Sequence, residues 1–425
     1  MATLEFISHS PHRAEVNDGA VKWVQAQRRN CFSNLPQICW RDETPWREAN
    51  LWALQKAENR KTRPTTITTF MRHITAYAKW LEAEGIDWWH FPARESDRCL
   101  VRYRGSLINA IDSGQLVSST AQQRMGAVIR FYKWLMATKL LSPEWPAWQD
   151  RHIGIKIVDR FGLERSMGVN STDLSIPNRR ADTSSLEEGL TPVLTADVVK
   201  ILKFSNEHAS EELDLLLRLG FGTGMRIGTL TDLKVDTVLN AVSAFNFPGF
   251  HCLSVGPGAQ PPVATKFGVT GQILISDEDL RLLKSYISSR RRLLRQAKAN
   301  AENRNLVFLT RHGTSYVASD GNASRTVNVE LGRLRKAGLR EGINAFHKFY
   351  FHRSRCTFAT ELARAACKAL PLSDAIQLVK ASMLHKDEAT TIKYIKFIEQ
   401  SADMAELANE FTRRFLGLGR QQDEA

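Results

Sequence analysis

The segment "YFHRSRCTFATEL", residues 350–362, constrains the fold of this chain more than any other stretch. Apolar residues recur at helical spacing toward its end, at Ala359, Leu362 and Ala363, which is typical of a helix packed into a core. Arg355 and His352 lie four and seven positions before Ala359 and therefore share its face. Three more basic residues crowd the same turn, namely His347, Lys348 and Arg353. Neither burial nor the positive partial charge of a helix N-terminus favours cations there, so the pattern predicts that a phosphate completes the site.

The composition agrees with an anionic partner. The chain has 425 residues, with 58 Lys and Arg against 45 Asp and Glu, which gives a formal net charge of +13. An excess of positive charge of this size indicates a polyanionic partner, although it also occurs in ordinary soluble enzymes. The length predicts two to three domains, and a hydrophobic content of 43% indicates a folded protein rather than a disordered basic tail.

The sequence also indicates a compartment. The first residues, "MATLEFISHSPHRAE", contain no apolar signal core, and no stretch is long enough to span a bilayer. The six cysteines, at positions 31, 39, 99, 252, 356 and 367, include no C-x-x-C pair and no spacing typical of metal ligands. We therefore expect reduced thiols, no metal, and a cytoplasmic protein that does not contact membranes.

The first half of the chain predicts a small helical bundle with a basic exterior, over residues 60–148. Residues 63–85 form its first amphipathic helix, which Thr65 or Thr66 caps and Gly85 ends. The second helix, over residues 118–141, turns an apolar face inward and basic residues outward. Residues 1–59 are expected to be a helical N-terminal extension, on the basis of the spacing of Trp40, Trp46 and Trp52. Residues 149–189 are polar and rich in turn formers, which predicts a linker.

The second half, residues 190–425, predicts a mainly helical domain that holds one small antiparallel sheet. A helix opens near Thr195, its expected cap, and a second helix, over 210–224, ends in glycines. The stretches "HCLSV" and "PPVATKFGVTGQILIS" alternate and contain glycine, which is typical of short strands joined by a hairpin turn. The remaining residues are largely helical in pattern.

This second half carries the residues with possible chemistry: Arg226, Lys266, His352, Arg355, His385 and Tyr394. Each also has a simpler interpretation when taken alone. Arg226 follows a glycine-ended helix and would then be a surface side chain, and Lys266 would be a solvated turn residue. Tyr394 lies beside Phe397 and Ile398, where a tyrosine is usually part of a core with its hydroxyl paired.

The order and spacing of these residues decide between the interpretations. The text "TGMRIGTL", then "TK", then "HRSRCTFAT", then "MLHKDEATTIKY" resembles the tyrosine recombinase (phage integrase) family. In that family the corresponding text is roughly T-G-x-R-x-x-E-L, T-K, H-x-L-R-H-T-F-A-T and L-G-H-x-x-x-x-T-T-x-x-Y. The resemblance covers about residues 190–400, while residues 60–148 resemble the helical core-binding domain of the family in layout only. It implies a helical DNA-gripping domain followed by an α+β catalytic domain.

The resemblance implies a role for each matched residue. Tyr394 would be the nucleophile that attacks a DNA phosphodiester and becomes linked to the 3′ phosphate. Arg226 and Arg355 would clamp the non-bridging oxygens as charge builds in the transition state. A phenol with a pKa of about 10 is a poor nucleophile at neutral pH, so a cluster of cations that stabilises its ionised form suits this chemistry.

The other matched residues would handle protons and the phosphate. Lys266 would protonate the leaving 5′ oxygen, His352 would assist proton transfer at the tyrosine, and His385 would donate a hydrogen bond to the phosphate. The resemblance implies no cofactor and no metal. It implies double-stranded DNA as the partner, a tetramer on paired DNA sites, and accessory DNA-bending proteins or a partner recombinase.

The implied function is that of a site-specific DNA recombinase or integrase of a mobile element, working through a phosphotyrosyl intermediate. Two alternatives stay open. A type IB topoisomerase-like or hairpin-resolving enzyme would share the chemistry, and a catalytically silent DNA-binding regulator would share only the fold.

The sequence departs from the family text at three places. Thr229 stands where the family has an acid, Leu384 stands where it has a glycine, and the stretch from Arg355 to His385 is longer than usual. A further apolar stripe follows the tyrosine in residues 402–419, formed by Met404, Leu407, Ala408, Phe411 and Phe415. This stripe either docks on its own catalytic domain or, as is common in the family, on a neighbouring protomer.

Overall fold

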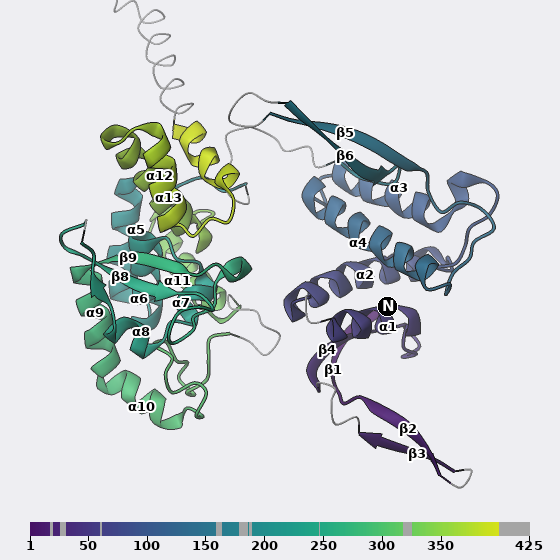
Figure 1. The fold of residues 1–425 in the computed structure, drawn as a ribbon, viewed down its shortest axis with the longest axis horizontal. Helices are drawn as coiled ribbons and strands as arrows, with labels where there is room; N and C mark the ends of the chain where they lie inside the picture. Colours follow the sequence, from purple (N-terminus) through teal and green to yellow (C-terminus); the bar gives the residue numbers. More distant parts are fainter. Residues whose placement is uncertain are drawn as a thin grey trace, which may run out of the picture. The chain divides into compact units, whose positions relative to one another are not determined.

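The computed structural model describes residues 1–17, 20–25, 31–59, 62–158, 164–177, 186, 189–245, 247–317 and 325–398. The chain forms two compact units, Met1–Ala181 and Asp182–Ala425, and each is described by itself. Figure 1 shows their helices and strands along the chain. In the described ranges we find no helix with both the length and the apolar character needed to cross a membrane.

In its described residues the N-terminal unit has four α-helices, two of which the apolar periodicity predicts. They are α1 (Arg47–Glu58), α2 (Pro64–Glu84), α3 (Cys99–Asp112) and α4 (Ser118–Ala137). Gly85 ends α2 with a left-handed φ of 63°, as expected. The predicted threonine cap is wrong, because Arg63 occupies the N-cap and Pro64 opens the helix. Proline suits this first position because it has no N–H that would be left without an intrahelical partner.

The core of this unit is rich in aromatic side chains. Trp46, Trp52, Tyr77, Phe131 and Tyr132 are buried together between the helices. The hydroxyls of Tyr77 and Tyr132 share a hydrogen bond of 2.8 Å, and Tyr132 also donates to the carbonyl of Trp88. Burial raises the pKa of both tyrosines, so these hydroxyls stay protonated and hold the helices together.

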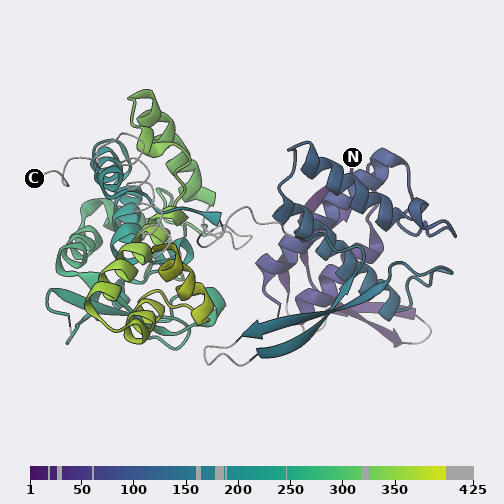
Figure 2. The ribbon, with the colours of Figure 1, turned by 90° about the horizontal axis from the view of Figure 1, so that it is seen from above.

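Three two-stranded ribbons in the described part of the same unit correct the sequence predictions. The strand β1 (Thr3–His9) pairs with β4 (Phe32–Cys39), β2 (His12–Asn17) with β3 (Ala20–Gln25), and β5 (Asp150–Val158) with β6 (Glu164–Thr172), all antiparallel. Figure 2 shows the β5–β6 hairpin as a long ribbon. The helical prediction for 1–59 therefore holds only for α1, and the linker prediction for 149–189 misses β5 and β6. Each strand has one partner strand, so backbone pairing defines it more than the apolar alternation that sequence patterns detect.

The C-terminal unit has the predicted fold class, a mainly helical domain with one small antiparallel sheet. The strands β7 (Val242–Ser243), β8 (Phe250–Val255) and β9 (Gly271–Ser276) pair in that order. The helices around the sheet are α5 (Thr195–His208), α6 (Glu211–Thr223), α7 (Ile227–Thr231), α8 (Val235–Leu239), α9 (Asp277–Ser288), α10 (Arg290–Lys298), α11 (Arg325–Arg340), α12 (His352–Ala369) and α13 (Leu372–Ser382). Leu194, rather than Thr195, is the N-cap of α5.

Among the described residues of this unit, two main hydrophobic cores accompany a small third cluster of Ala299, Leu306 and Leu309. The larger core joins the leucine-rich α6 to the sheet, α5, α9 and α11. The smaller core lies between α12, α13 and the helix 388–398, and it contains Cys356, Met383 and Tyr394. The helix α12 packs against both α6 and α13, so its first turns lie where the two cores meet. The extra residues between Arg355 and His385 form the end of α12 and most of α13.

Candidate active site

The end of α6 places Arg226. Gly224 closes this helix with a left-handed φ of 64°. A Cβ on Gly224 would lie 2.5 Å from Cδ1 of Phe358 and 2.9 Å from Sδ of Met383, so glycine alone fits both the conformation and the space. Arg226 follows two residues later as the half-buried N-cap of α7. The turn at Gly224 thus packs against Phe358 of α12, and Arg226 follows this turn directly.

Arg355 connects two helix ends. Its side chain is 2% exposed, Nη1 donates to the carbonyl of Gly224 over 2.7 Å, and Nη2 donates to the carbonyl of Met383 over 2.9 Å. These carbonyls belong to the C-terminal ends of α6 and α13, where the helix dipole concentrates negative charge. The buried guanidinium is therefore compensated by backbone. Arg355 holds together the turn before Arg226 and the turn before His385.

The turn before His385 keeps the geometry that the family glycine would provide. The amide of Leu384 donates to the carbonyl of Ala381 over 3.1 Å, and the amide of His385 donates to the carbonyl of Lys380 over 3.0 Å. This pair of bonds is the Schellman motif, which needs a left-handed residue directly after the helix C-cap. Leu384 supplies it with a φ of 48°. The departure from the family text therefore leaves the backbone path to His385 intact, at a cost of roughly 1–2 kcal/mol for a left-handed leucine.

His385 and Tyr394 lie against each other in the smaller core. Nδ1 of His385 shares a hydrogen bond of 2.9 Å with the hydroxyl of Thr391, and its ring stacks on Tyr394 with centroids 5.9 Å apart. Tyr394 is 0% exposed, and its hydroxyl donates to Sγ of Cys356 over 3.9 Å. The helix that carries Tyr394 begins at residue 388, so Thr391 lies inside it and bonds the histidine instead of capping the helix.

Lys266 is exposed in the short η3 turn (Lys266–Gly268) that precedes β9. Its Nζ lies 5.5 Å from the ring centroid of Phe267, and Nζ of Lys386 lies 6.0 Å from the same ring. Lys386 directly follows His385 in the chain. The lysine predicted from the hairpin text is thus placed beside the turn that carries the late histidine.

His352 and Arg353 begin α12 and have different surroundings. His352 is half-buried at the first position of the helix, as predicted. Arg353 donates to the carbonyls of Thr191 and Pro192 over 2.9 and 3.1 Å, and burial lowers the pKa of its guanidinium. Arg353 therefore anchors the segment before α5, and the hypothesis that all the cations of this turn await a phosphate is too broad. Sequence spacing selects Arg355 as a site residue, but it could not show that Arg353 bonds Thr191 and Pro192, because these partners are distant in the chain.

Two residues near the candidate site were not predicted from the sequence. Cys356 accepts a hydrogen bond from the hydroxyl of Tyr394, and the ring of Phe267 lies near two lysines. Neither cysteine nor phenylalanine by itself indicates such a site in a sequence. Thr229, which replaces the acid of the family text, is buried in α7. Its hydroxyl is neutral, so this position places no negative charge in the turn after Arg226.

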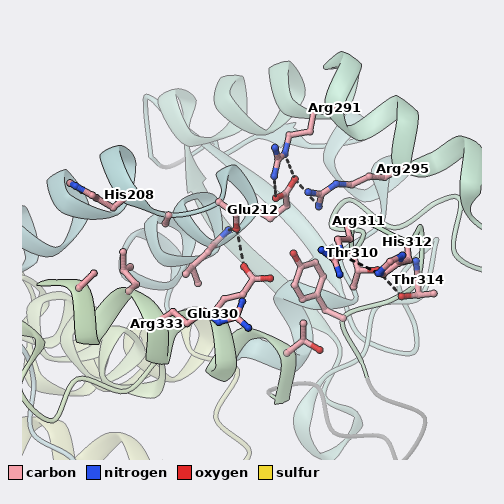
Figure 3. Close-up of a pocket in the computed structure, with 17 residues that line it drawn as sticks. His208, Glu212, Arg291, Arg295, Thr310, Arg311, His312, Thr314, Glu330 and Arg333 are labelled. Atoms are coloured by element: carbon pink, nitrogen blue, oxygen red, sulfur yellow. Dashed lines mark hydrogen bonds and ion pairs between the residues drawn. The ribbon is translucent and has the colours of Figure 1, made fainter.

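The opposite end of α6 holds a separate ionic cluster, drawn in Figure 3. The carboxylate of Glu212 accepts from Arg291 at 2.8 and 2.9 Å and from Tyr286 at 2.9 Å, and it lies 2.8 Å from Nη1 of Arg295. Burial alone would raise the pKa of Glu212, but these arginines outweigh it and hold the pKa below its ordinary value.

The cluster faces a pocket of about 970 Å³, which none of the six candidate residues lines. The helix α6 has 13 residues and is therefore ~20 Å long, which separates this pocket from the turn at Gly224. We assign the pocket no part in the predicted chemistry.

Comparison with known proteins assigns the family. Residues 192–400 match the phage integrase family. The chain is similar to the solved Tn1549 transposon integrase in complex with circular intermediate DNA, at 15% identity and a TM-score of 0.48, over 82% of this chain and 94% of that one. It is also similar to a λ integrase dimer bound to a COC′ core site, at 16% identity and a TM-score of 0.46, over 82% and 92% of the two chains.

A third solved structure, that of XerA recombinase, has 14% identity and a TM-score of 0.34 over 84% of this chain and 98% of that one. No curated protein sequence matches the chain. The matched segment contains all six candidate residues and belongs to the tyrosine recombinase (phage integrase) family.

Proposed function

We propose that this protein is a site-specific DNA recombinase that cuts and rejoins DNA through a 3′-phosphotyrosyl intermediate. One observation carries the proposal. Arg355 bonds the carbonyls of Gly224 and Met383, so a single buried cation assembles the turns that lead to Arg226 and His385. Tyr394 stacks on that same histidine. These contacts support the proposal that four residues separated by up to 168 positions in the sequence share one site.

The chemistry follows from the types of these residues. The phenolic oxygen of Tyr394 attacks the phosphorus of a phosphodiester, and the bond from phosphorus to the 5′ oxygen breaks. Negative charge on the non-bridging oxygens is stabilised by Arg226 and Arg355. The phosphotyrosyl bond conserves the energy of the broken diester, so attack by a 5′ hydroxyl on this bond rejoins the DNA.

Proton transfer falls to the remaining residues. Lys266 gives a proton to the leaving 5′ oxygen, and His352 assists removal of the phenolic proton of Tyr394. His385 donates a hydrogen bond to the phosphate. The ring of His385 is oriented for this by Thr391, which binds its other nitrogen.

Tyr394 must move before it reacts. Its side chain is fully buried and its hydroxyl bonds Cys356, so a DNA phosphate has no path to the phenolic oxygen in this arrangement. We propose that DNA binding shifts the helix 388–398 and turns Tyr394 toward the arginines. The bond to a thiol is a weak one, which keeps the cost of this movement low.

The partner in this proposal is duplex DNA, which matches the formal net charge of +13. Most of the affinity would come from phosphate contacts and would fall with salt. The proposal also includes a tetramer on paired sites, accessory DNA-bending proteins or a partner recombinase, and a cytoplasmic, DNA-associated location. The domain scheme stays a prediction, with an extension over 1–59, a DNA-gripping domain over 60–148, a linker over 149–189 and a catalytic domain over 190–425.

A covalent-trapping experiment tests the chemistry. Duplexes selected by binding to the protein itself are nicked beside the cleavage position, so that the freed fragment diffuses away. The wild-type protein should give an adduct that survives detergent, and Tyr394→Phe should abolish it. Tyr350→Phe is the matched control, because Tyr350 is 52% exposed and lies two residues before His352.

The other outcomes have distinct meanings. An adduct that persists in Tyr394→Phe would overturn the assignment of the nucleophile. Covalent cleavage and rejoining without exchange between two sites would indicate a topoisomerase-like or hairpin-resolving enzyme. Site-specific binding without any adduct would indicate a silent regulator.

The assembly is tested by a truncation after Gln400. The stripe in residues 402–419 lies outside the described residues, and we propose that it docks on a neighbouring protomer. The truncated protein should bind one half-site nearly as well as the full chain, but lose cooperative binding of a second protomer and lose recombination. A mobility-shift titration on one and two half-sites measures this. Retained cooperativity would mean that the stripe docks on its own domain.

A further inference from the structure

Leu384 occupies a backbone conformation that leucine disfavours. Its φ is 48°, and the two backbone hydrogen bonds of the Schellman motif hold it there. Glycine would satisfy the same bonds without strain. The backbone therefore gives no reason for a leucine at this position, and the reason has to lie in where its side chain goes.

The side chain of Leu384 fills a space that Gly271 leaves open. A Cβ on Gly271 would lie 2.5 Å from Cδ2 of Leu384, so the leucine rests directly on this glycine. Gly271 opens the strand β9 and has no left-handed φ, so its own backbone would accept any residue. The missing side chain at 271 is thus explained by the presence of the one at 384.

The contact joins the two cores. Leu384 packs on the larger core, whereas Met383, one residue earlier, belongs to the smaller core that contains Tyr394. A second contact lies on the other side of His385, where Nζ of Lys386 approaches the ring of Phe267 at 6.0 Å. Phe267 is the neighbour of Lys266, and Gly271 lies five residues after that lysine. The turn 384–386 therefore contacts the segment 266–271 on both sides of His385.

We propose that Leu384 is a positioning residue for the reaction. Its side chain packs on Gly271 and thereby holds the Lys266 loop against the His385 turn. This inference rests on the proposed function. Lys266 is exposed in a short loop, so its distance from the leaving oxygen depends on what holds that loop. A displacement of about 1 Å can cost on the order of 10²-fold in rate. A glycine at 384 would keep the path to His385 but remove the contact with Gly271 at the end of the Lys266 loop.

The first experiment separates proton donation from the other steps. Single-turnover cleavage by Leu384→Gly is measured on an ordinary phosphodiester and on a 5′-phosphorothiolate, whose leaving group needs no proton. We expect a loss of about 10- to 100-fold on the phosphodiester and recovery to within about threefold of wild type on the phosphorothiolate. Lys266→Ala should lose more cleavage activity on the phosphodiester than Leu384→Gly does, and the phosphorothiolate should restore it in the same way. The melting temperature of Leu384→Gly confirms that it is folded.

Glu43→Gly is the matched control for the backbone change. Glu43 also has a left-handed φ, of 67°, but it is an exposed acidic residue before α1, outside the proposed DNA-gripping domain. This substitution relieves the same kind of strain without touching the catalytic domain, so it should leave both cleavage rates unchanged.

The second experiment tests the contact between Leu384 and Gly271 by a double-mutant cycle. Gly271→Ala should lower phosphodiester cleavage, because its methyl group displaces Leu384. In the Leu384→Gly background the same methyl group has room, so the added substitution should cause no further loss. Gly332→Ala in α11 is the control, because nothing lies within 4 Å of a Cβ at that position.

Each outcome is decisive. Wild-type cleavage of the phosphodiester by Leu384→Gly, a loss that the phosphorothiolate does not rescue, or additive effects of the two substitutions would each overturn the positioning role. Failure of the proposed function looks different. In that case the wild-type protein forms no adduct, or Lys266→Ala is not rescued, and the inference falls with it.

Discussion

The helices α6 and α13 both end at a left-handed residue, but this residue is a glycine in α6 and a leucine in α13. Each is closed by a left-handed residue, Gly224 at 64° and Leu384 at 48°, and Arg355 bonds a carbonyl at each end. Around Gly224 there is no space, because Phe358 and Met383 would collide with a Cβ. Around Leu384 there is space, because the facing residue is Gly271. A left-handed residue thus ends both helices, with no side chain at the α6 end and with room for one at the α13 end.

The energetics of the two ends differ accordingly. A left-handed glycine carries little steric cost, whereas a left-handed leucine costs roughly 1–2 kcal/mol. Full burial of a leucine contributes about 1.5–3 kcal/mol, and Leu384 is half-buried. The two terms are of similar size, so Leu384 can replace glycine with little net change in the stability of the fold.

Arg355→Ala should have the largest effect on cleavage, because Arg355 donates hydrogen bonds to the carbonyls at the ends of both α6 and α13. We expect cleavage to fall by about 10³-fold or more, through loss of a charge donor to the transition state. We also expect a lower melting temperature, because two buried carbonyls lose their partner. Arg226→Ala is the comparison variant, with a loss of about 10²- to 10³-fold in cleavage and a nearly unchanged melting temperature. Equal melting temperatures for the two variants would contradict the bridging role.

Gly224→Ala tests the crowded end. The left-handed conformation and the collision with Phe358 together should lower the free energy of unfolding by about 2–4 kcal/mol. Chemical denaturation of the folded chain measures this directly. A change below about 1 kcal/mol would mean that α6 and α12 separate easily, and the contrast between the two ends would disappear.

Glu212→Gln tests the N-terminal end of α6, opposite the turn at Gly224. Removing this carboxylate leaves Arg291 and Arg295 without their shared partner, and because Arg291 is partly exposed we expect a loss of about 2 kcal/mol at neutral pH. The arginines hold the pKa of Glu212 below its ordinary value, so this contribution is fully present above the unfolded-state pKa and is lost as the pH falls through the folded-state pKa.

Stability curves of Glu212→Gln and wild type should therefore converge in acid. Single-turnover cleavage at neutral pH should stay within a few-fold of wild type, because Arg355 fixes the other end of α6. A large loss of cleavage would show that the geometry at Gly224 depends on the whole helix.

Leu384→Gly should have the smallest effect on stability. Relief of the left-handed strain offsets the lost packing, so the free energy of unfolding should change by less than about 1 kcal/mol. Comparison with Gly224→Ala under the same denaturation conditions makes the contrast quantitative. A loss of more than about 2 kcal/mol would mean that Leu384 is mainly a core residue.

The sequence by itself determined the local features of this protein. The apolar periodicity predicts α2, α4, α6 and α12, and the glycines at 85 and 224 end their helices as expected. Helical periodicity and left-handed caps depend on residues within a few positions of each other, so they can be recognised without a fold. The resemblance to the family rests on four short stretches of sequence, each of which can also be recognised without a fold.

Only the tertiary structure decided the rest. The bonds of Arg355 reach 131 residues back to Gly224 and 28 residues forward to Met383, so no local pattern shows which carbonyls this arginine bonds. The paired strands of residues 3–39 and 150–172 depend on backbone partners, not on an apolar alternation. Whether a leucine can stand in for a glycine at 384 depends on Gly271, which lies more than one hundred residues away in the chain. Such contacts join residues through space, where packing and hydrogen bonding take effect only after the chain has folded.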